Sequence, residues 1–114
     1  MSEKQKMAED IVNRVVKNVN AKSTVLAKWG KSWQMYFTDI NVGYILKMDM
    51  DGKVEKIDKA DKKGTAAVTM IFDTPDTLVK MMDKKLNNMA AMSTGKCKVE
   101  GPIPELMKIS TAMS

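Results

Sequence analysis

Few side chains in this sequence belong to the types that enzymes use for chemistry. The chain contains no histidine, and histidine is the commonest general base and the commonest metal ligand. The single cysteine, Cys97, is expected inside a strand, where a buried thiol acts as a small hydrophobic group rather than as a nucleophile. We therefore expect no catalytic residue, and the chain is not predicted to be an enzyme.

The acidic residues do not predict a metal or cofactor site. Five of the fourteen lie between Asp49 and Asp61, without the spacing and the closing glutamate of a calcium loop. A hairpin followed by a polar loop explains them. The six glycines are scattered, so the sequence contains no glycine-rich phosphate loop.

The positive charge is spread along the chain and mixed with negative charge. The net charge is +5, and the 19 basic residues include one arginine, Arg14, among 14 acidic residues. Nucleic-acid-binding proteins favour arginine for bidentate contacts to bases and phosphates, so no nucleic-acid partner is expected. Weak attraction to anionic headgroups stays open, and with it a transient contact with a membrane surface.

Methionine is the side chain in which this sequence is unusually rich. The chain has twelve methionines, and those in its last part are Met70, Met81, Met82, Met89, Met92, Met107 and Met113. Methionine fills irregular gaps in ordinary cores, and it also lines surfaces that adapt to apolar partners of varying shape. The composition leaves both roles open.

The length and the hydrophobic pattern predict one domain over residues 1–114. A chain of 114 residues is long enough to bury one core without disulfides. No apolar run reaches the roughly 18 residues that span a bilayer, and the polar start is unlike a secretory signal. With a lone cysteine that cannot form an intrachain disulfide, these features make the cytoplasm the expected location.

The elements that would position these side chains begin with an amphipathic helix. Ser2 and Gln5 form a capping-box pattern, and apolar residues then recur at helical spacing between Met7 and Val19. This spacing predicts a helix of about 16 residues. A break and a short helical turn over residues 25–29 follow.

A two-residue repeat of apolar side chains predicts the strands. They span residues 33–37, 44–50, 53–57, 65–72 and 96–100. The first strand presents Trp33, Met35 and Phe37 on one face. Asp51-Gly52 signals a tight hairpin between the second and third strands. The third strand is charged and is expected at a sheet edge.

Three helices are predicted around the last strand. Thr74-Pro75-Asp76 is a helix start with the threonine as the cap. Asn87 caps a short helix that stops at Gly95, and Pro104 begins a final helix. This order of elements predicts an α+β domain, in which helices cover one face of a sheet.

Three segments of the chain together carry a family resemblance. Lys85 to Gly101 reads KLNNMAAMSTGKCKVEG and is similar to the block GKLNPxxAFxxGKLKIxGD. Val68-Thr69-Met70 followed by Thr77-Leu78 is similar to a strand-to-helix junction, and Leu106-Met107-Lys108 to a final helix. Through these three features, residues 66–109 resemble the sterol carrier protein 2 (SCP2) domain family. This family has the SCP-like lipid-transfer fold.

Several residues depart from the pattern of that family. Lys84 stands where the family often has glycine, and Asn88 replaces the usual proline. Ala91 and Met92 stand near the paired aromatic residues of the family, and residues 102–104 replace a turn. The exchange of rings for alanine and methionine changes the size and flexibility of any cavity.

The resemblance implies a five-stranded mixed, mostly antiparallel sheet with helices over one face. It also implies a hydrophobic tunnel between them for a fatty acyl chain, acyl-CoA, phospholipid or sterol, in which each buried CH₂ contributes roughly 0.8 kcal/mol. The chain is thus expected to be a non-catalytic intracellular lipid binding or transfer protein. The expected apolar lining is Trp33, Met35, Phe37, Met70, Phe72, Met81, Met82, Met89, Met92, Leu106, Met107, Ile109 and Met113, and weaker headgroup contacts are expected from Lys84, Lys85, Lys96 and Lys98. The final helix is the expected lid.

Two other functions remain open at the level of the sequence. The methionine-rich surface could dock a protein partner or a second copy of the chain, which would give a homodimer. The domain could also be an accessory part of a lipid-metabolising enzyme.

Overall fold

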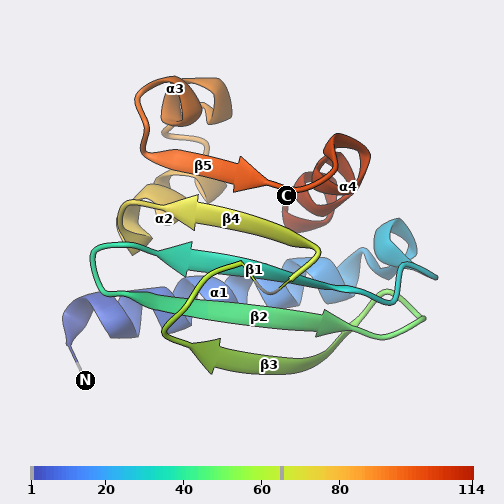
Figure 1. Cartoon of the computed structure of the whole chain (residues 1–114). Helices are drawn as coiled ribbons and strands as arrows, with labels where there is room; N and C mark the ends of the chain where they lie inside the picture. Colours follow the sequence, from blue (N-terminus) through green and yellow to red (C-terminus); the bar gives the residue numbers. More distant parts are fainter. Residues whose placement is uncertain (1, 65) are drawn as a thin grey trace.

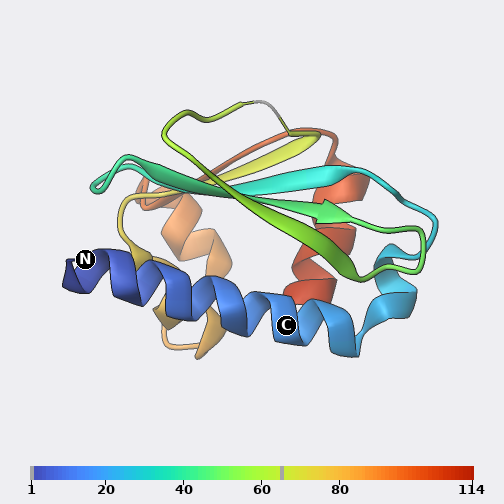
Figure 2. The same ribbon diagram turned by 90° about the horizontal axis from the view of Figure 1, so that it is seen from below.

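The computed structural model describes residues 2–64 and 66–114, and it places one sheet against a layer of helices (Figures 1 and 2). The first helix, α1 (Glu3–Ala21), begins as predicted, because the Ser2 hydroxyl accepts a hydrogen bond from the Gln5 N–H at 3.1 Å. It buries a stripe made of Ala8, Ile11, Val12, Val15 and Val19.

This helix extends beyond its predicted end, and two asparagines explain the difference. Asparagine normally competes with helical hydrogen bonding through its side chain. Here the Asn18 amide donates to the Met113 carbonyl at 2.9 Å, and the Asn20 carbonyl accepts from the Val54 N–H at 2.9 Å. Because both side chains are hydrogen-bonded to distant segments, they do not compete for the helical backbone, and the helix continues for 19 residues.

The remaining helical segments are short. They are the 3₁₀ turn η1 (Ser23–Leu26), α2 (Pro75–Met82), α3 (Asn88–Ser93) and α4 (Ile103–Met113). Asn87 caps α3 as predicted, since its side-chain oxygen accepts from the Met89 N–H at 2.8 Å. The predicted start of α2 is confirmed, with Thr74 at the N-cap position and Pro75 as the first helical residue, but the Thr74 side chain makes no capping bond. Instead the Asp73 carboxylate accepts from the Thr74 N–H at 2.8 Å and from the Thr77 hydroxyl.

The sheet has five strands in the order β3-β2-β1-β4-β5. They are β1 (Ser32–Phe37), β2 (Val42–Met48), β3 (Val54–Ala60), β4 (Val68–Phe72) and β5 (Cys97–Glu100). The central pair β1 and β4 is parallel, and the other pairs are antiparallel. The predicted mixed five-stranded sheet with helices over one face is therefore confirmed, as Figure 2 shows.

Three strands differ from their predicted ranges by two residues or more, and the other two by one residue. β2 lies two residues earlier, so that Met50 falls in the turn. β3 is an edge strand as expected, but it continues to Ala60 because residues 58–60 also pair with β2, although Asp58 and Lys59 are charged. Residue 65, with which the fourth strand was predicted to begin, lies outside the described residues, and β4 begins at Val68.

The β2–β3 hairpin is closed by one aspartate and one glycine. The Asp49 carboxylate accepts from the N–H groups of Asp51 and Lys53, at 2.9 and 3.0 Å. Gly52 has φ +83°, and a Cβ atom there would lie 1.8 Å from the Ser23 carbonyl oxygen. Only glycine therefore fits, and the hairpin tip packs directly on η1.

The hydrophobic core fills the space between the sheet and the helices. Trp33, Phe37 and Phe72 are completely buried there, and the two phenylalanine rings stack with centroids 5.7 Å apart. The Phe37 edge also meets Tyr44 at 6.3 Å. Within the described residues, no helix is both long and apolar enough to cross a bilayer.

Candidate ligand-binding cavity

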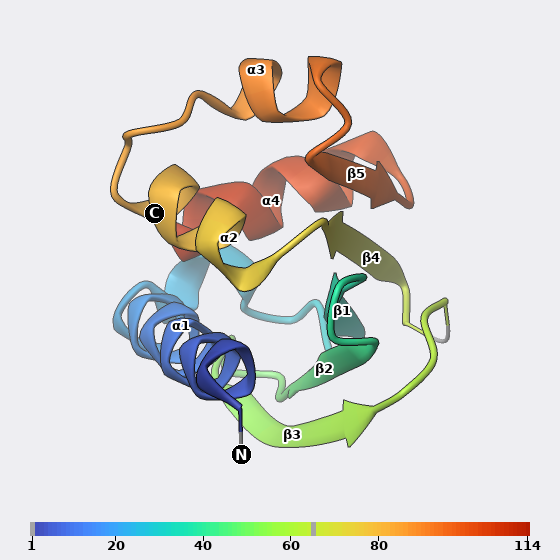
Figure 3. The ribbon, with the colours of Figure 1, turned by 90° about the vertical axis from the view of Figure 1, so that its left-hand side faces the viewer.

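A small apolar cavity lies between β4, α2 and the end of α4. Its volume is about 100 Å³. Figure 3 shows the elements around it, with α2 and the end of α4 next to one another on the helix side of β4. Its walls are formed by Met70, Phe72, Leu78, Met81, Met82, Lys84, Asn88, Ser110, Met113 and Ser114.

The periodicity of the two main elements explains why these side chains converge. In β4, Met70 and Phe72 are two residues apart, so both point to the helix side of the sheet. In α2, Leu78, Met81 and Met82 are three and four residues apart, so they share one helix face. The strand and the helix thus present apolar side chains to the same space.

Methionine dominates the wall of this cavity. Met70, Met81, Met82 and Met113 come from three different elements, β4, α2 and α4. A thioether side chain has three rotatable bonds and no branch, so it can change rotamer without moving the backbone. The side chains of the cavity wall can therefore change rotamer to enlarge the cavity.

The cavity opens to solvent between Lys84 and Asn88. An outer hollow of about 400 Å³ shares Met81, Lys84 and Asn88 with the cavity and continues over Leu86 and Met89. The two spaces therefore meet at the loop between α2 and α3. Lys84 has the only charged side chain among the described residues that line the inner cavity.

The backbone holds Lys84 in an unusual conformation. The Lys84 N–H donates to the Met81 carbonyl at 3.1 Å, and the Lys85 N–H to the Lys80 carbonyl at 2.8 Å. This is the Schellman pattern, in which the residue after the helix cap is left-handed and usually glycine. Lys84 has φ +60°, so a lysine occupies a position that favours glycine.

The end of α4 closes the other side of the cavity and is tied to α1. The Met113 carbonyl accepts from the Asn18 side chain at 2.9 Å, and the Ser114 carbonyl accepts from the Lys22 ammonium group. Ser110, Met113 and Ser114 line the cavity. The side chains of Asn18 in α1 and of Lys22, the residue after α1, therefore hold this wall of the cavity in place.

The predicted lining residues divide into three groups. Met70, Phe72, Met81, Met82 and Met113 line the cavity. Trp33, Met35, Phe37 and Ile109 are buried in the core outside the cavity, and Leu106 is partly buried. Met89, Met92 and Met107 are exposed, by 79, 47 and 65%.

The predicted headgroup lysines are also separated by the fold. Lys84 lies at the mouth, whereas Lys85, Lys96 and Lys98 are exposed and do not line the cavity. The sequence-based prediction missed Leu78, Asn88, Ser110 and Ser114. Leu78 has a readable signal, because its spacing places it on the face of Met81 and Met82.

Three other features of the described residues are the Cys97 thiol, the acidic side chains and a hollow beside α1, and none of them forms a chemical site. Burial raises the pKa of the Cys97 thiol to about 11, with a further contribution from Asp73, so the thiol is protonated at neutral pH. No group of His, Cys, Asp and Glu in the described residues could hold a metal. A larger hollow of about 490 Å³ between α1 and Val79 of α2 is open, with Glu3, Lys6, Asp10 and Arg14 around it, and is a surface groove.

Comparisons with known proteins agree with this architecture. A family model described as the SCP-2 sterol transfer family matches residues 12–114. Sterol Carrier Protein 2 Like 2 from Aedes aegypti has a TM-score of 0.68 and 17% identity, covering 94% of this chain and 96% of that chain. The palmitated SCP2L2 from Aedes aegypti has a TM-score of 0.55 and 15% identity, covering 90% and 95%.

The same fold also occurs as one part of a larger enzyme. The sec-alkylsulfatase Pisa1 from Pseudomonas sp. aligns with a TM-score of 0.64 and 18% identity over 81% of this chain. This chain spans only 14% of the length of that enzyme. No curated protein sequence matches the chain significantly.

Proposed function

The chain belongs to the SCP-2 sterol transfer family, whose members bind and transfer lipids, and from this premise we propose that it carries fatty acids without catalysing a reaction. The acyl tail would occupy the methionine-lined cavity, and the carboxylate would lie at the mouth beside Lys84. The observation that carries the proposal is this combination of a soft apolar cavity with a single cation at its opening.

The size of the cavity favours a flexible chain over a rigid ring system. A volume of about 100 Å³ holds about three methylene-sized groups, if each takes about 30 Å³, the share of a water molecule in the liquid. Ligand sites usually measure about 300–1,000 Å³. The cavity must therefore enlarge, and an acyl chain can enter stepwise as methionines change rotamer, whereas a sterol needs the full space at once.

The position of Lys84 favours an anionic headgroup. Its ammonium group is a point charge on a flexible stem and can follow a carboxylate into the opening between the cavity and the outer hollow. The left-handed backbone would be relaxed by glycine, so the lysine is explained better by what its side chain does than by the fold. The palmitated structure of the Aedes aegypti protein supports an acyl ligand.

The test compares three ligands that differ in charge and rigidity. The delipidated protein is titrated calorimetrically with palmitate, methyl palmitate and cholesterol. We expect saturable binding of one palmitate, at least tenfold weaker binding of the uncharged ester, and the weakest binding for cholesterol. Absence of saturable palmitate binding would contradict the proposal, and equal affinity for palmitate and its ester would remove the role of Lys84.

A second candidate function is an accessory role beside an enzyme that acts on alkyl substrates. The observation that favours it is the match to a small part of the sec-alkylsulfatase. In that role the cavity would hold the alkyl chain of the enzyme's substrate. A secondary alkyl sulfate would then bind as tightly as palmitate, and a preference of tenfold or more for palmitate would count against this function.

A further inference from the structure

The two tryptophans of this chain differ in what their ring N–H groups contact. The Trp29 N–H donates to the Glu105 carboxylate at 2.8 Å. Trp33 is completely buried in the core, and among residues 2–64 and 66–114 its N–H finds no hydrogen-bond acceptor. A buried donor without an acceptor lowers the stability of the fold, and nearly all buried polar groups in proteins avoid that state. The Trp33 N–H therefore needs an explanation beyond packing.

One other buried side chain of the described residues, Tyr44, also has a polar atom without a partner. Tyr44 lines a hollow of about 270 Å³ beside α1, together with Glu9, Asn13 and Lys59, so polar side chains lie next to it. The residues opposite Trp33 on the neighbouring strands are instead apolar, Leu46 on β2 and Val68 on β4. Trp33 thus holds its donor in apolar surroundings.

Trp33 lies one step along the sheet from the wall of the cavity. In the parallel pairing of β1 with β4, which lie side by side in Figure 1, Met35 is opposite Met70, and Trp33 is opposite Val68. Met70 lines the cavity, and residues two apart in a strand share one face. Trp33 and Met70 are therefore diagonal neighbours on the helix side of the sheet, roughly 7–8 Å apart and within reach of an aromatic side chain.

Two methionines separate the cavity from Trp33. A volume of about 100 Å³ is too small for a long acyl chain, so the cavity must extend past its present walls. Met70 and Met35 are unbranched and can change rotamer without moving the backbone. An extension in their direction brings the inner end of the ligand to the Trp33 N–H.

We propose that the Trp33 N–H is a ligand-binding group that selects fatty acids with a ketone oxygen on the hydrocarbon tail. The ring N–H is only a donor, and a ketone oxygen is only an acceptor, so their hydrogen bond leaves no further polar group unpaired. A plain tail would leave the N–H without a partner. A hydroxyl group would bring a donor of its own into apolar surroundings, and a second carboxylate would bury a charge. The inference rests on the proposed function, because the carboxylate beside Lys84 determines which end of the ligand lies inside.

The primary experiment is a calorimetric titration of the delipidated full chain with stearate and with oxostearates. The ketone is placed at carbon 8, 10, 12, 14 or 16. We expect one position, or two adjacent ones in the series, to bind at least fivefold more tightly than stearate, and the hydroxyl analogue at that position to bind more weakly than the ketone. Equal affinity for stearate and every oxostearate would overturn this inference and leave the proposed function standing. Failure of every acid to bind, stearate included, would contradict both.

A pair of matched variants assigns the preference to one ring. Trp33→Phe removes the unpaired N–H and keeps an aromatic ring, whereas Trp29→Phe removes the other indole N–H of the chain. Trp33→Phe should bind stearate and the preferred oxostearate with affinities within twofold of one another. Trp29→Phe should keep the preference, and both variants should show the circular dichroism of the unmodified protein. A preference that persists in Trp33→Phe would overturn the role of Trp33.

A spectroscopic measurement tests the same hydrogen bond in the unmodified protein, whether or not Trp33→Phe folds. The two indole N–H resonances of the ¹⁵N-labelled chain are assigned from the spectrum of Trp29→Phe. Saturation with the preferred oxostearate should shift the Trp33 N–H proton downfield, and by more than saturation with stearate does. The Trp29 resonance is the internal control, since its N–H is already bonded to Glu105. A Trp33 resonance that moves equally with both acids, or with neither, would overturn the inference.

Discussion

Two residues in equivalent positions adopt the same left-handed backbone with different side chains. Gly95 and Lys84 each follow the cap of a short helix with the same hydrogen-bond pattern, and their φ angles are +77° and +60°. Gly95 is the residue type usually found in this left-handed position. Lys84 is not of that type, and it lies at the mouth of the cavity.

Replacement of this lysine is therefore expected to change stability and binding in opposite directions. A left-handed non-glycine residue costs roughly 1–2 kcal/mol, and the greater freedom of glycine in the unfolded chain removes about 0.5–1 kcal/mol of the gain. Lys84→Gly should raise the free energy of unfolding by about 0.5–1 kcal/mol while palmitate binding weakens. Urea unfolding and calorimetric titration measure the two quantities.

Lys84→Met is the matched variant for this prediction. It keeps the left-handed strain and much of the side-chain length but removes the charge. Its stability should stay near that of the unmodified protein, and its affinity for palmitate should fall as in Lys84→Gly. Unchanged affinity in both variants would remove the headgroup role of Lys84, whatever happens to stability.

For the methionines, the sequence does not predict which side chains line the cavity and which are exposed. Met81 and Met82 line the cavity, whereas Met89 and Met92, which follow a similar helix start, are exposed. The reason is that α3 buries only Ala91, whose small side chain permits close packing. Residue type and spacing do not say which face of a six-residue helix will be buried.

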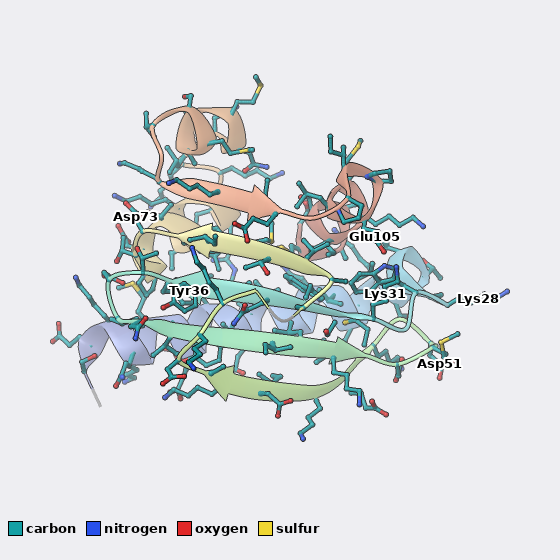
Figure 4. The ribbon with its side chains drawn as sticks, in the orientation of Figure 1. Lys28, Lys31, Tyr36, Asp51, Asp73 and Glu105 are labelled. Carbon is teal, nitrogen blue, oxygen red and sulfur yellow. The ribbon has the colours of Figure 1, made fainter. Side chains whose placement is uncertain are left out.

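At the scale of elements, α4 is held by polar contacts at both ends. Figure 4 shows Lys31 and Glu105 directed toward one another near its start. The hydrogen bonds from Lys31, and then from Trp29, hold the pKa of Glu105 below its ordinary value. This contact therefore stabilises the fold above the unfolded pKa of Glu105 and is lost only as the pH falls through the lowered folded value.

The contact at the other end of α4 controls the cavity wall. Asn18→Ala removes the hydrogen bond to the Met113 carbonyl, so the end of α4 should move more freely. We expect a loss of about 1 kcal/mol in the free energy of unfolding, together with faster association and dissociation of palmitate in stopped-flow fluorescence. Asn13→Ala, on the same helix but not bonded to α4 in the described contacts, is the control. Slower exchange of palmitate would contradict the role of α4 as a movable wall.

The elements themselves were largely predictable because their signals are local. The capping pair Ser2 and Gln5 and the Asn87 cap each depend on residues within one turn, and the structure confirms both starts. The errors arise where distant partners intervene. Asn18 and Asn20 prolong α1 through bonds to α4 and β3, and Asp73 takes over the role predicted for Thr74.

For the whole molecule, buried ionisable groups predict how stability changes at alkaline pH. Burial raises the pKa of Cys97 to about 11 from an ordinary 9.0, and burial followed by the charge of Glu9 raises the pKa of Tyr44. The folded protein therefore binds more protons than the unfolded chain above pH 9. Its free energy of unfolding should fall as the pH rises through this range.

Cys97→Ala provides the comparison for this prediction. It removes the thiol, so its stability should fall less steeply between pH 9 and 11 in urea unfolding, although its stability at neutral pH is lower because of the lost packing. A residual slope is expected from Tyr44. Identical pH dependence in the two proteins would mean that the folded environment does not perturb Cys97.

The overall architecture followed from the sequence, whereas the cavity did not. The resemblance of residues 66–109 is confirmed by the family match over residues 12–114, and the mixed sheet by its strand order. The volume of the cavity depends on how Met70, Met82 and Met113 pack from three separate elements. Rotamers of unbranched side chains are set by the assembled fold and have no local signal in the sequence.

The parallel pairing of β1 with β4 also has a consequence for the folding kinetics. Every pair in its register, from Trp33–Val68 to Phe37–Phe72, joins residues 35 positions apart, so its loop closes late compared with the local hairpins. The segment from β4 to α4, which surrounds the cavity, therefore joins a β1–β3 meander that can form before it. Hydrogen exchange at β4 and β5 should consequently report the opening of the cavity-bearing half as one cooperative unit.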